Sequence, residues 1–341
     1  MAVAISSTMD QASRASTIPL DGRRSSMRRP LIGAVAAAAW VGVALLTILW
    51  SDLPDTEWDY TGNLAAAFAA LGVLLALATS ADFWFACLPR IQRLAPWMLA
   101  LALLAGAWET VTAKLGILPM PFFPPPQALL EVVIDDRARL AEGVVASLRL
   151  LAGGYFLGAV LGFVVGVAMG WSRAVGYWIH PILRFVGPLP ATAWLPLAFF
   201  VFPSSHSAST FLIALATGFP VTVLTWSGVA SVSRAYYDIA RTLGANQSFL
   251  ILKVTIPAAM PHVFVGLFMG LGNSFAVLVI AEMLGVKAGL GWYLQWAQGW
   301  AAYANMYAAL LIMALIFSGL ITLLFRLRDR LLAWQKGLVR W

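Results

Sequence analysis

Long uncharged stretches separated by short polar segments dominate this chain. Six runs contain no charged residue, and a seventh, at about 94–117, is interrupted by Glu109 and Lys114. The six runs are Leu31–Ser51, Tyr60–Ala81, Leu150–Ser172, Phe185–Ser233, Val254–Ala281 and Ala288–Phe325. About 20 apolar residues cross a bilayer as a helix, so the run from Phe185 has room for two crossings with a turn near Pro203. The pattern predicts eight transmembrane helices, at about 32–50, 63–85, 96–117, 147–170, 180–202, 208–230, 262–284 and 305–325.

The composition supports an all-helical, polytopic membrane protein. Of 341 residues, 61% are hydrophobic and 11% are charged, against roughly 25% charged residues in soluble domains. The single cysteine, Cys87, excludes an internal disulfide and a cysteine-rich metal site. Residues 1–30 are polar and rich in Ser and Arg, which predicts a disordered tail before a retained first span.

The basic residues predict the orientation of the chain. With the N-terminus in the cytoplasm, three of the 22 Lys and Arg fall in outer loops, namely Arg137, Arg139 and Lys287. Sixteen fall in cytoplasmic segments: Arg14, Arg23, Arg24, Arg28, Arg29, Arg90, Arg93, Arg173, Arg234, Arg241, Lys253, Arg326, Arg328, Arg330, Lys336 and Arg340. The positive-inside rule therefore places both termini and residues 231–260 in the cytoplasm. The net charge of +7 points to anionic membrane lipid as a partner rather than nucleic acid, because the basic residues lie at membrane edges.

A polar island at 234–261 separates two apolar stretches. Ser233 is expected to cap a first helix, Gly244 to end it in the left-handed conformation, and Asn246 to cap a second helix that runs to Pro257. The island is thus predicted to form a helix, a glycine elbow and a second helix at the membrane surface.

Two further segments are candidates for functional roles. Glycines at every fourth position from Gly154 to Gly170 leave one face of the fourth span bare, so that a neighbouring helix can approach closely. Prolines interrupt the fifth span, and the backbone carbonyls that they free are tolerated only against protein or a wet cavity. Packing alone explains either segment as well. The pathway candidates are Pro188, Pro190, Trp194, Asn273 and Glu282.

The chain resembles the permease subunits of ATP-binding-cassette importers. The cytoplasmic EAA loop of those subunits is matched by Asp238-Ile239-Ala240, Gly244 and Ile256-Pro257. Further pieces, from about Leu94 to Gln335, are similar to the nitrate, sulfonate and taurine group of the family. These pieces are Leu118-Pro119, Ser147-Leu148-Arg149, Trp194-Leu195-Pro196, Ala281-Glu282-Met283-Leu284 and Gly289-Leu290-Gly291.

The resemblance implies a type I importer permease in the bacterial inner membrane, with a core of six spans at 94–341. Residues 31–93, an added two-span hairpin with its linker, lie outside the usual plan and are expected to be a removable appendage. The family pattern implies a homodimer that receives solute from an external binding protein and rests on two cytoplasmic ATP-binding subunits. The residues implied in coupling are Asp238, Ala240, Arg241, Gly244 and Pro257. Asp238 and Arg241 are also spaced to pair with each other on one helix.

The resemblance implies a small anion as solute, such as nitrate, a sulfonate such as taurine, or bicarbonate. A pyrimidine-like vitamin precursor is the alternative solute. The chain itself is not expected to be an enzyme that hydrolyses nucleotide, because it contains no Gly-Lys pair of a phosphate-binding loop. No cofactor and no metal are expected either. His180, His206 and His262 lie at the ends of different spans without a second ligand at metal spacing.

A proton-coupled secondary transporter is the rival class. Glu109, Asp82 and Glu282 lie in or near spans, where a charged side chain needs a partner, water or a proton. Such a transporter relays protons through acids of this kind, but it does not need the cytoplasmic elbow.

Overall fold

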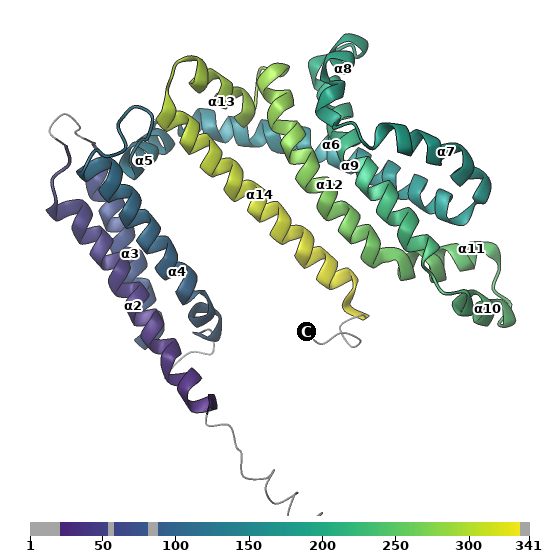
Figure 1. Cartoon of the computed structure of the whole chain (residues 1–341), viewed down its shortest axis with the longest axis horizontal. Coiled ribbons are helices and arrows are strands. Elements are labelled where there is room, and N and C mark those ends of the chain that lie inside the picture. Colours follow the sequence, from purple (N-terminus) through teal and green to yellow (C-terminus); the bar gives the residue numbers. More distant parts are fainter. Residues whose placement is uncertain (1–20, 54–57, 81–87, 335–341) are drawn as a thin grey trace, which may run out of the picture. The chain divides into compact units, whose positions relative to one another are not determined.

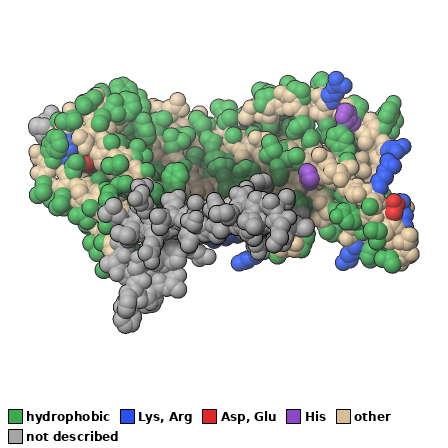
Figure 2. Space-filling model, turned by 60° about the horizontal axis from the view of Figure 1, so that its bottom comes forward, with side chains coloured by type: hydrophobic (Ala, Val, Ile, Leu, Met, Phe, Trp, Pro, Cys, Tyr) green, Lys and Arg blue, Asp and Glu red, His purple; other side chains and the backbone are tan. Residues whose placement is uncertain are grey.

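The computed structural model describes residues 21–53, 58–80 and 88–334, and every regular element in these ranges is helical. The predicted all-helical fold class is confirmed. The chain divides into two compact units, Met1–Glu131 and Val132–Trp341 (Figure 1). Hydrophobic side chains cover most of the described face in Figure 2, with few charged side chains among them, as expected of a surface that contacts lipid.

The first unit contains three long helices, α2 (Asp21–Leu49), α3 (Thr61–Ser80) and α4 (Leu88–Glu109). Helix α2 packs against both others through small and aromatic side chains, with the Trp40 and Phe68 rings 5.4 Å apart and Ala102 of α4 fully buried. The third span therefore packs with the first two, and the first compact unit ends at Glu131. Helix α2 begins within the segment assigned to the tail, and residues 1–20 lie outside the described ranges.

A buried polar cluster joins α2 to the end of α4. After α4 the chain continues as a π-helix, η1 (Thr110–Lys114), and the Lys114 ammonium is fully buried. It donates to the carbonyl oxygens of Thr47 (3.0 Å) and Trp50 at the C-terminal end of α2. It also pairs with Asp52 at 2.7 Å and with Glu109 at 3.7 Å. A cation at a helix C-terminus is favoured by the helix dipole, so Lys114 links the first span to the third.

The second unit begins in α5 (Pro126–Asp135) and contains the remaining helices. These are α6 (Arg137–Trp171), α7 (Arg173–Val186), η2 (Ala191–Trp194), α8 (Leu195–Val201), α9 (Ser205–Ala230), α10 (Arg234–Thr242), α11 (Gln247–Phe249), η3 (Leu250–Thr255), α12 (Ile256–Leu284), α13 (Leu290–Gly299) and α14 (Tyr303–Leu331). Its main core lies where α6, α8, α9 and α12 meet, around residues such as Leu151, Leu212 and Leu278.

Helices α6 and α9 are parallel and touch along the predicted glycine face. A side chain at Gly154 would meet Ile213, one at Gly162 would meet Val221, and one at Gly170 would meet Val229. Residue numbers thus increase in the same direction along both helices, as they must in a parallel pair. The expectation that the glycine face admits a close neighbour is confirmed.

The other long helices alternate in direction. Gly266 and Gly270 of α12 lie against Val221 and Thr217 of α9, so these two helices are antiparallel. Helix α14 is antiparallel to α12, because Phe325 stacks near Phe268 (5.2 Å) and Phe317 near Phe275 (4.7 Å). The C-terminal ends of α9 and α14 therefore lie at the same end of this unit as the start of α12.

The parallel arrangement of α6 and α9 requires the chain between them to return across the unit. That return is made by α7 and by η2 with α8, which are bent by 87° relative to each other at the break that contains Pro188 and Pro190. The fifth span, predicted at 180–202 with prolines that interrupt it, is therefore bent, and its two helices cover Arg173–Val186 and Ala191–Val201. In the described ranges seven helices are long and apolar enough to cross a membrane, and the count reaches the predicted eight when the bent pair is taken as one span.

The glycine contact between α6 and α9 gives a matched pair of variants. Gly158→Val is expected to lower the stability of the protein by roughly 1–3 kcal/mol, because its Cβ would overlap the backbone of Ala214 and the helices would have to separate. Gly153→Val introduces the same residue on the same helix, where nothing lies within 4 Å. Thermal unfolding of the two detergent-solubilised variants measures the difference. Equal midpoints would contradict the packing role.

The Lys114 cluster changes what is expected of a truncated chain. Deleting residues 1–88 should destabilise the rest, because Lys114 loses Asp52 and the carbonyl groups of α2, and an ion pair broken on one side costs about 3–5 kcal/mol when buried. The same truncation with Lys114→Met and Glu109→Gln removes the stranded charges and should recover part of the loss. The monodisperse fraction after detergent extraction is the measurement, with the full chain as control. If both truncated chains behave like the full chain, the first two spans are a removable appendage after all.

Candidate functional site

The polar island forms the predicted elbow. The Ser233 hydroxyl accepts a hydrogen bond from the backbone N–H of Ala235 (3.4 Å) at the start of α10. Gly244 has a φ of +82°, and Asn246 Oδ1 accepts from the N–H of Phe249 at 2.8 Å. Both caps and the left-handed glycine were predicted from the sequence, and all three are confirmed. Nothing lies within 4 Å of a Cβ built on Gly244, so its backbone conformation alone favours glycine there.

The second helix of the elbow does not end at Pro257. Helix α11 passes through the π-helix η3 into α12, so helical structure is continuous from Gln247 to Leu284. Pro257 sits in the first turn of α12, where its missing N–H costs little. The Thr255 hydroxyl donates to the carbonyl of Leu250 (2.9 Å) and is 3.0 Å from the Tyr237 hydroxyl of α10. These contacts fix the elbow to the membrane helix.

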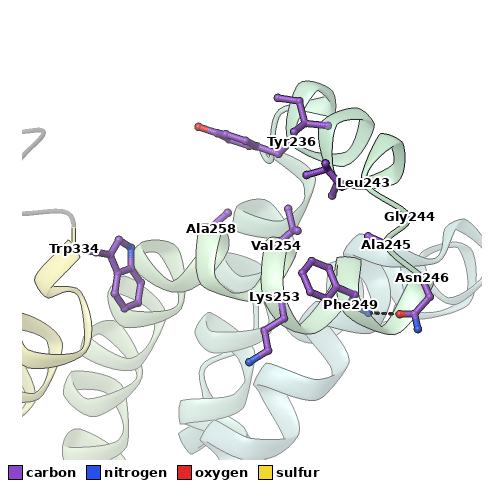
Figure 3. A pocket seen from close by; sticks show the side chains of 12 residues that line it. Tyr236, Leu243, Gly244, Ala245, Asn246, Phe249, Lys253, Val254, Ala258 and Trp334 are labelled. Atoms are coloured by element: carbon purple, nitrogen blue, oxygen red, sulfur yellow. Dashed lines mark hydrogen bonds between the residues drawn. The ribbon is translucent and has the colours of Figure 1, made fainter.

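An open groove of about 780 Å³ lies along the elbow (Figure 3). Its lining is largely apolar, and the side chains of Leu243 and Ile239 are 82% and 60% exposed. Trp334, which follows α14, lies at the far side of the groove. The residues that line it are Tyr236, Ile239, Ala240, Leu243, Gly244, Ala245, Asn246, Phe249, Lys253, Val254, Ala258 and Trp334.

The polar residues of the elbow remain accessible. Asp238 and Arg241 approach to 3.8 Å within α10, which is the intrahelical pair that their spacing allowed. Their side chains are 71% and 57% exposed, and ion pairs this open contribute little to stability. Both groups can therefore exchange this contact for one with another protein. Ala240, in contrast, is buried and packs the helix onto its own unit.

A second cavity, of about 450 Å³, lies where the fifth span bends. Pro190 and Asn273, which were both pathway candidates, line it together with the hydroxyl-bearing Thr192. Its remaining lining residues are Val186, Gly187, Leu189, Ala191, Leu215, Ala216, Phe219, Pro220, Ala276, Val277 and Ile280, so no charged side chain lines the cavity. Pro188 lies in the bend without lining this cavity, and Trp194 packs on the core of the unit.

Glu282, the remaining pathway candidate, is held away from this cavity. Its side chain is buried, and its Oε2 accepts from the Ser147 hydroxyl (3.0 Å) and from the N–H of Gly291 (2.8 Å). The Ser147 hydroxyl in turn accepts from the N–H of Leu290 at 2.9 Å. Two free N–H groups at the start of α13 thus find side-chain acceptors, that of Gly291 in the Glu282 carboxyl group and that of Leu290 in the Ser147 hydroxyl, as in helix capping. Glu282 joins α6, α12 and α13.

A neighbouring network holds the same end of the unit. The Tyr293 hydroxyl donates to Asp136 Oδ2 at 2.7 Å and accepts from the Asn305 side chain at 2.7 Å. Burial raises the pKa of the Tyr293 phenol above its usual range, so it remains a donor. The arrangement connects α13 and α14 to the turn before α6.

Each acid of the rival class that lies in the described residues is bound within its own unit. Glu109 accepts from the Gln127 side chain and pairs with Lys114 within the first unit, whereas Glu282 is bound within the second. Asp82 and Cys87 lie outside the described residues. In the described ranges no group of three His, Cys, Asp or Glu side chains is arranged to hold a metal ion.

Two members of these sites were missed from the sequence. Thr192 lies inside the proline-rich segment that was singled out, so its hydroxyl was a recognisable candidate. Trp334 faces the elbow from a helix end that is remote in the sequence, and no local pattern signals that contact.

Comparison with known proteins agrees with these features. Residues 158–336 match the family described as "Binding-protein-dependent transport system inner membrane component". The nitrate import permease protein NrtB of Synechococcus elongatus is 28% identical over 74% of this chain and 91% of its own. The taurine transport system permease protein TauC of Escherichia coli is 33% identical over 69% and 88%. A solved inward-facing structure of the MetNI methionine ABC transporter has the same fold, with a TM-score of 0.50 and 15% identity over 57% of this chain and 97% of that one.

The Glu282 cluster can be tested through Ser147. Ser147→Ala is expected to lower stability by about 1–3 kcal/mol, because the N–H of Leu290 loses its buried acceptor and Glu282 Oε2 loses one of its two donors. Thr322→Ala is the control, since that exposed hydroxyl bonds only to the Ser318 carbonyl of its own helix. Thermal unfolding of both variants is the measurement. Equal midpoints would show that the cluster does not hold α13 in place.

Proposed function

We propose a function from the premise that this chain belongs to the family of binding-protein-dependent transport system inner membrane components. It is the multi-pass permease subunit of an ATP-binding-cassette importer in the inner membrane. As a transport component it has ATP-binding and solute-binding proteins as partners. We propose where these partners bind, which solute is transported and which route it takes.

The elbow is the docking site of the ATP-binding subunits, one on each copy of a permease homodimer. The observation that carries this assignment is the capped elbow, with Gly244 in the left-handed conformation and helical structure continuous into α12. Its groove exposes the apolar side chains of Leu243 and Ile239 beside Asp238 and Arg241, which suits a soluble partner with a matching surface. Ala240 and Pro257 position the two arms, so a rigid-body movement of the partner reaches the membrane helices.

The elbow and both termini face the cytoplasm. The alternating directions of α9, α12 and α14 support this for the C-terminus, because they bring the end of α14 to the elbow end of the unit. The sixteen basic residues assigned to cytoplasmic segments support the same orientation by the positive-inside rule. Solute-binding protein then docks at the opposite end, where Glu282 and Tyr293 hold α13.

The solute route runs between two copies of the chain and includes the cavity at the bent span. Pro190, Thr192 and Asn273 line this cavity, so a solute there meets one hydroxyl and one amide group in an otherwise apolar space. Pro188 shapes the bend, Trp194 supports it from the core, and Glu282 fixes the outer end of the unit.

The solute is a small inorganic or organic anion, with nitrate, taurine and bicarbonate as the first compounds to test. Relatives named for nitrate import and for taurine transport support this class. An uncharged cavity suits passage, because a fixed countercharge there would hold the anion in place. Selection among anions then falls to the solute-binding protein.

The assignment is tested at Gly244 in a complex reconstituted into vesicles with its ATP-binding subunits and its solute-binding protein. Gly244→Val is expected to abolish solute uptake and solute-stimulated ATP hydrolysis, because a β-branched residue resists a φ of +82°. Gly244→Asn, which tolerates that conformation better, should retain most of both activities. Uptake of nitrate, taurine and bicarbonate is measured with and without ATP.

Two outcomes would contradict the proposal. Normal solute-stimulated ATP hydrolysis in an assembled Gly244→Val complex would show that the elbow does not couple ATP hydrolysis to transport. Uptake driven by a proton gradient without ATP would favour the secondary transporter.

A further inference from the structure

Helix α7 carries a basic stripe on its outward face. None of its 14 residues is buried, and no acidic residue occurs in Arg173–Val186. At about 100° per residue, Arg173, Tyr177, His180 and Arg184 fall within an arc of about 60°. The half-buried residues Val175, Ile179 and Leu183 lie on the opposite side of the helix and pack on the unit. All four stripe residues are exposed, and of these the His180 ring also contacts Trp226 of α9.

Helix α7 occupies the elbow half of the unit. Just before it, Trp171 contacts Tyr237 of α10, with ring centroids 6.0 Å apart. The His180 ring is 5.4 Å from Trp226, near the C-terminal end of α9, and a side chain at Gly187 would meet Phe219 of α9. The step from His180 to Gly187 along α7 therefore corresponds to the step from Trp226 back to Phe219 along α9, so the two helices are antiparallel. Arg184 therefore lies within about 10 Å of the bend, measured along the helix. It is thus in the membrane-crossing part of the chain.

Arg184 differs from the other basic residues placed in predicted spans. Lys114 is neutralised by Asp52 and Glu109, and the exposed Arg149 lies two residues from Ser147 at the opposite end of α6. Arg184 is exposed and forms no ion pair with any residue in the described ranges. A charged side chain at such a depth faces water or a partner rather than hydrocarbon.

We propose that the stripe Arg173–Tyr177–His180–Arg184 lines the inner half of the solute route and attracts the anion out of the bend cavity toward the cytoplasm. The inference rests on the proposed function and deepens it. Val186 and Gly187, two and three residues after Arg184, line the bend cavity, so the stripe begins close to the edge of that uncharged cavity. The anion thus meets hydroxyl and amide groups first and positive charge afterwards.

Charge favours a solute anion over the other occupants of this face. A dry contact with a second copy would bring the same arginines together without any acid from α7 to balance them. Lipid contact would place Arg184 against acyl chains in the half of the span that lies farther from the headgroups. A water-filled route between two copies leaves the stripe hydrated. The positive potential of the stripe would then raise the local concentration of anions, because clefts lined by one sign of charge concentrate the opposite ion.

The test measures the local potential without knowledge of the solute. Tyr177→Cys is introduced in a Cys87→Ser background, and the full complex is placed in nanodiscs, which leave both faces open. The rates of modification by an anionic and by a cationic methanethiosulfonate reagent are compared at low salt. We expect the anionic reagent to be favoured, and Arg184→Gln to reduce the ratio of the two rates by about twofold to fourfold, the effect of one charge at about 10 Å in water.

Two further variants control the measurement. Arg184→Lys should preserve the ratio, because it keeps the charge at the same position. Arg149→Gln removes an equal charge at the other end of the unit and should leave the ratio unchanged. A ratio that is insensitive to Arg184→Gln would overturn the proposal. Modification of the introduced thiol only by a membrane-permeant maleimide would do the same, since it would assign the stripe to lipid.

Nitrate uptake by the same complexes separates this inference from the proposed function. Arg184→Gln should lower the uptake rate while basal ATP hydrolysis and the response to Gly244→Val persist. An unchanged nitrate rate in an active Arg184→Gln complex overturns the inference and leaves the importer assignment standing. A charge-sensitive ratio in a complex that transports none of the tested anions supports the wet, basic route and instead refutes the choice of solutes.

Discussion

The close, parallel contact between α6 and α9 is the constraint on which the rest of the second unit depends. The two helices approach so closely that a Cβ at Gly158 or Gly166 would overlap the backbone or side chains of α9. Because they run in the same direction, the chain between them has to cross back, and it does so through the bent pair α7 and α8. The bend then leaves the cavity that Asn273 and Pro190 share. One packing face thus determines the direction of a span and the position of the candidate route.

Local signals made the elbow predictable. Ser233, Gly244 and Asn246 each act on their own backbone within three residues, so their types and spacing were sufficient to predict both caps and the turn. The continuation past Pro257 was missed because proline usually marks a helix end. Here the chain adopts a π-helix before the proline and so enters α12 without a break.

Contacts between distant segments were not predictable in the same way. The run from Phe185 showed where prolines interrupt a span, but no local pattern indicated the 87° angle between α7 and the helices that follow it. Similarly, the sequence indicated that Glu109 needs a partner, but not that its partner Lys114 also holds Asp52 and the end of α2. That cluster ties the third span to the first unit, and no local pattern along the chain signals such a contact.

The unbroken helical stretch from Gln247 to Leu284 has a mechanical consequence. It spans 38 residues, or about 57 Å at 1.5 Å per residue, so under the proposed docking at the elbow it would act as a lever that reaches the opposite end of the unit. A rotation of about 5° at the elbow displaces the far end by about 5 Å for a rod of that length. At that end Glu282 holds α6 and α13, and the movement is therefore delivered to three helices at once. Greater flexibility at the π-helix of this stretch would reduce the displacement at its far end without changing either of the proposed docking surfaces.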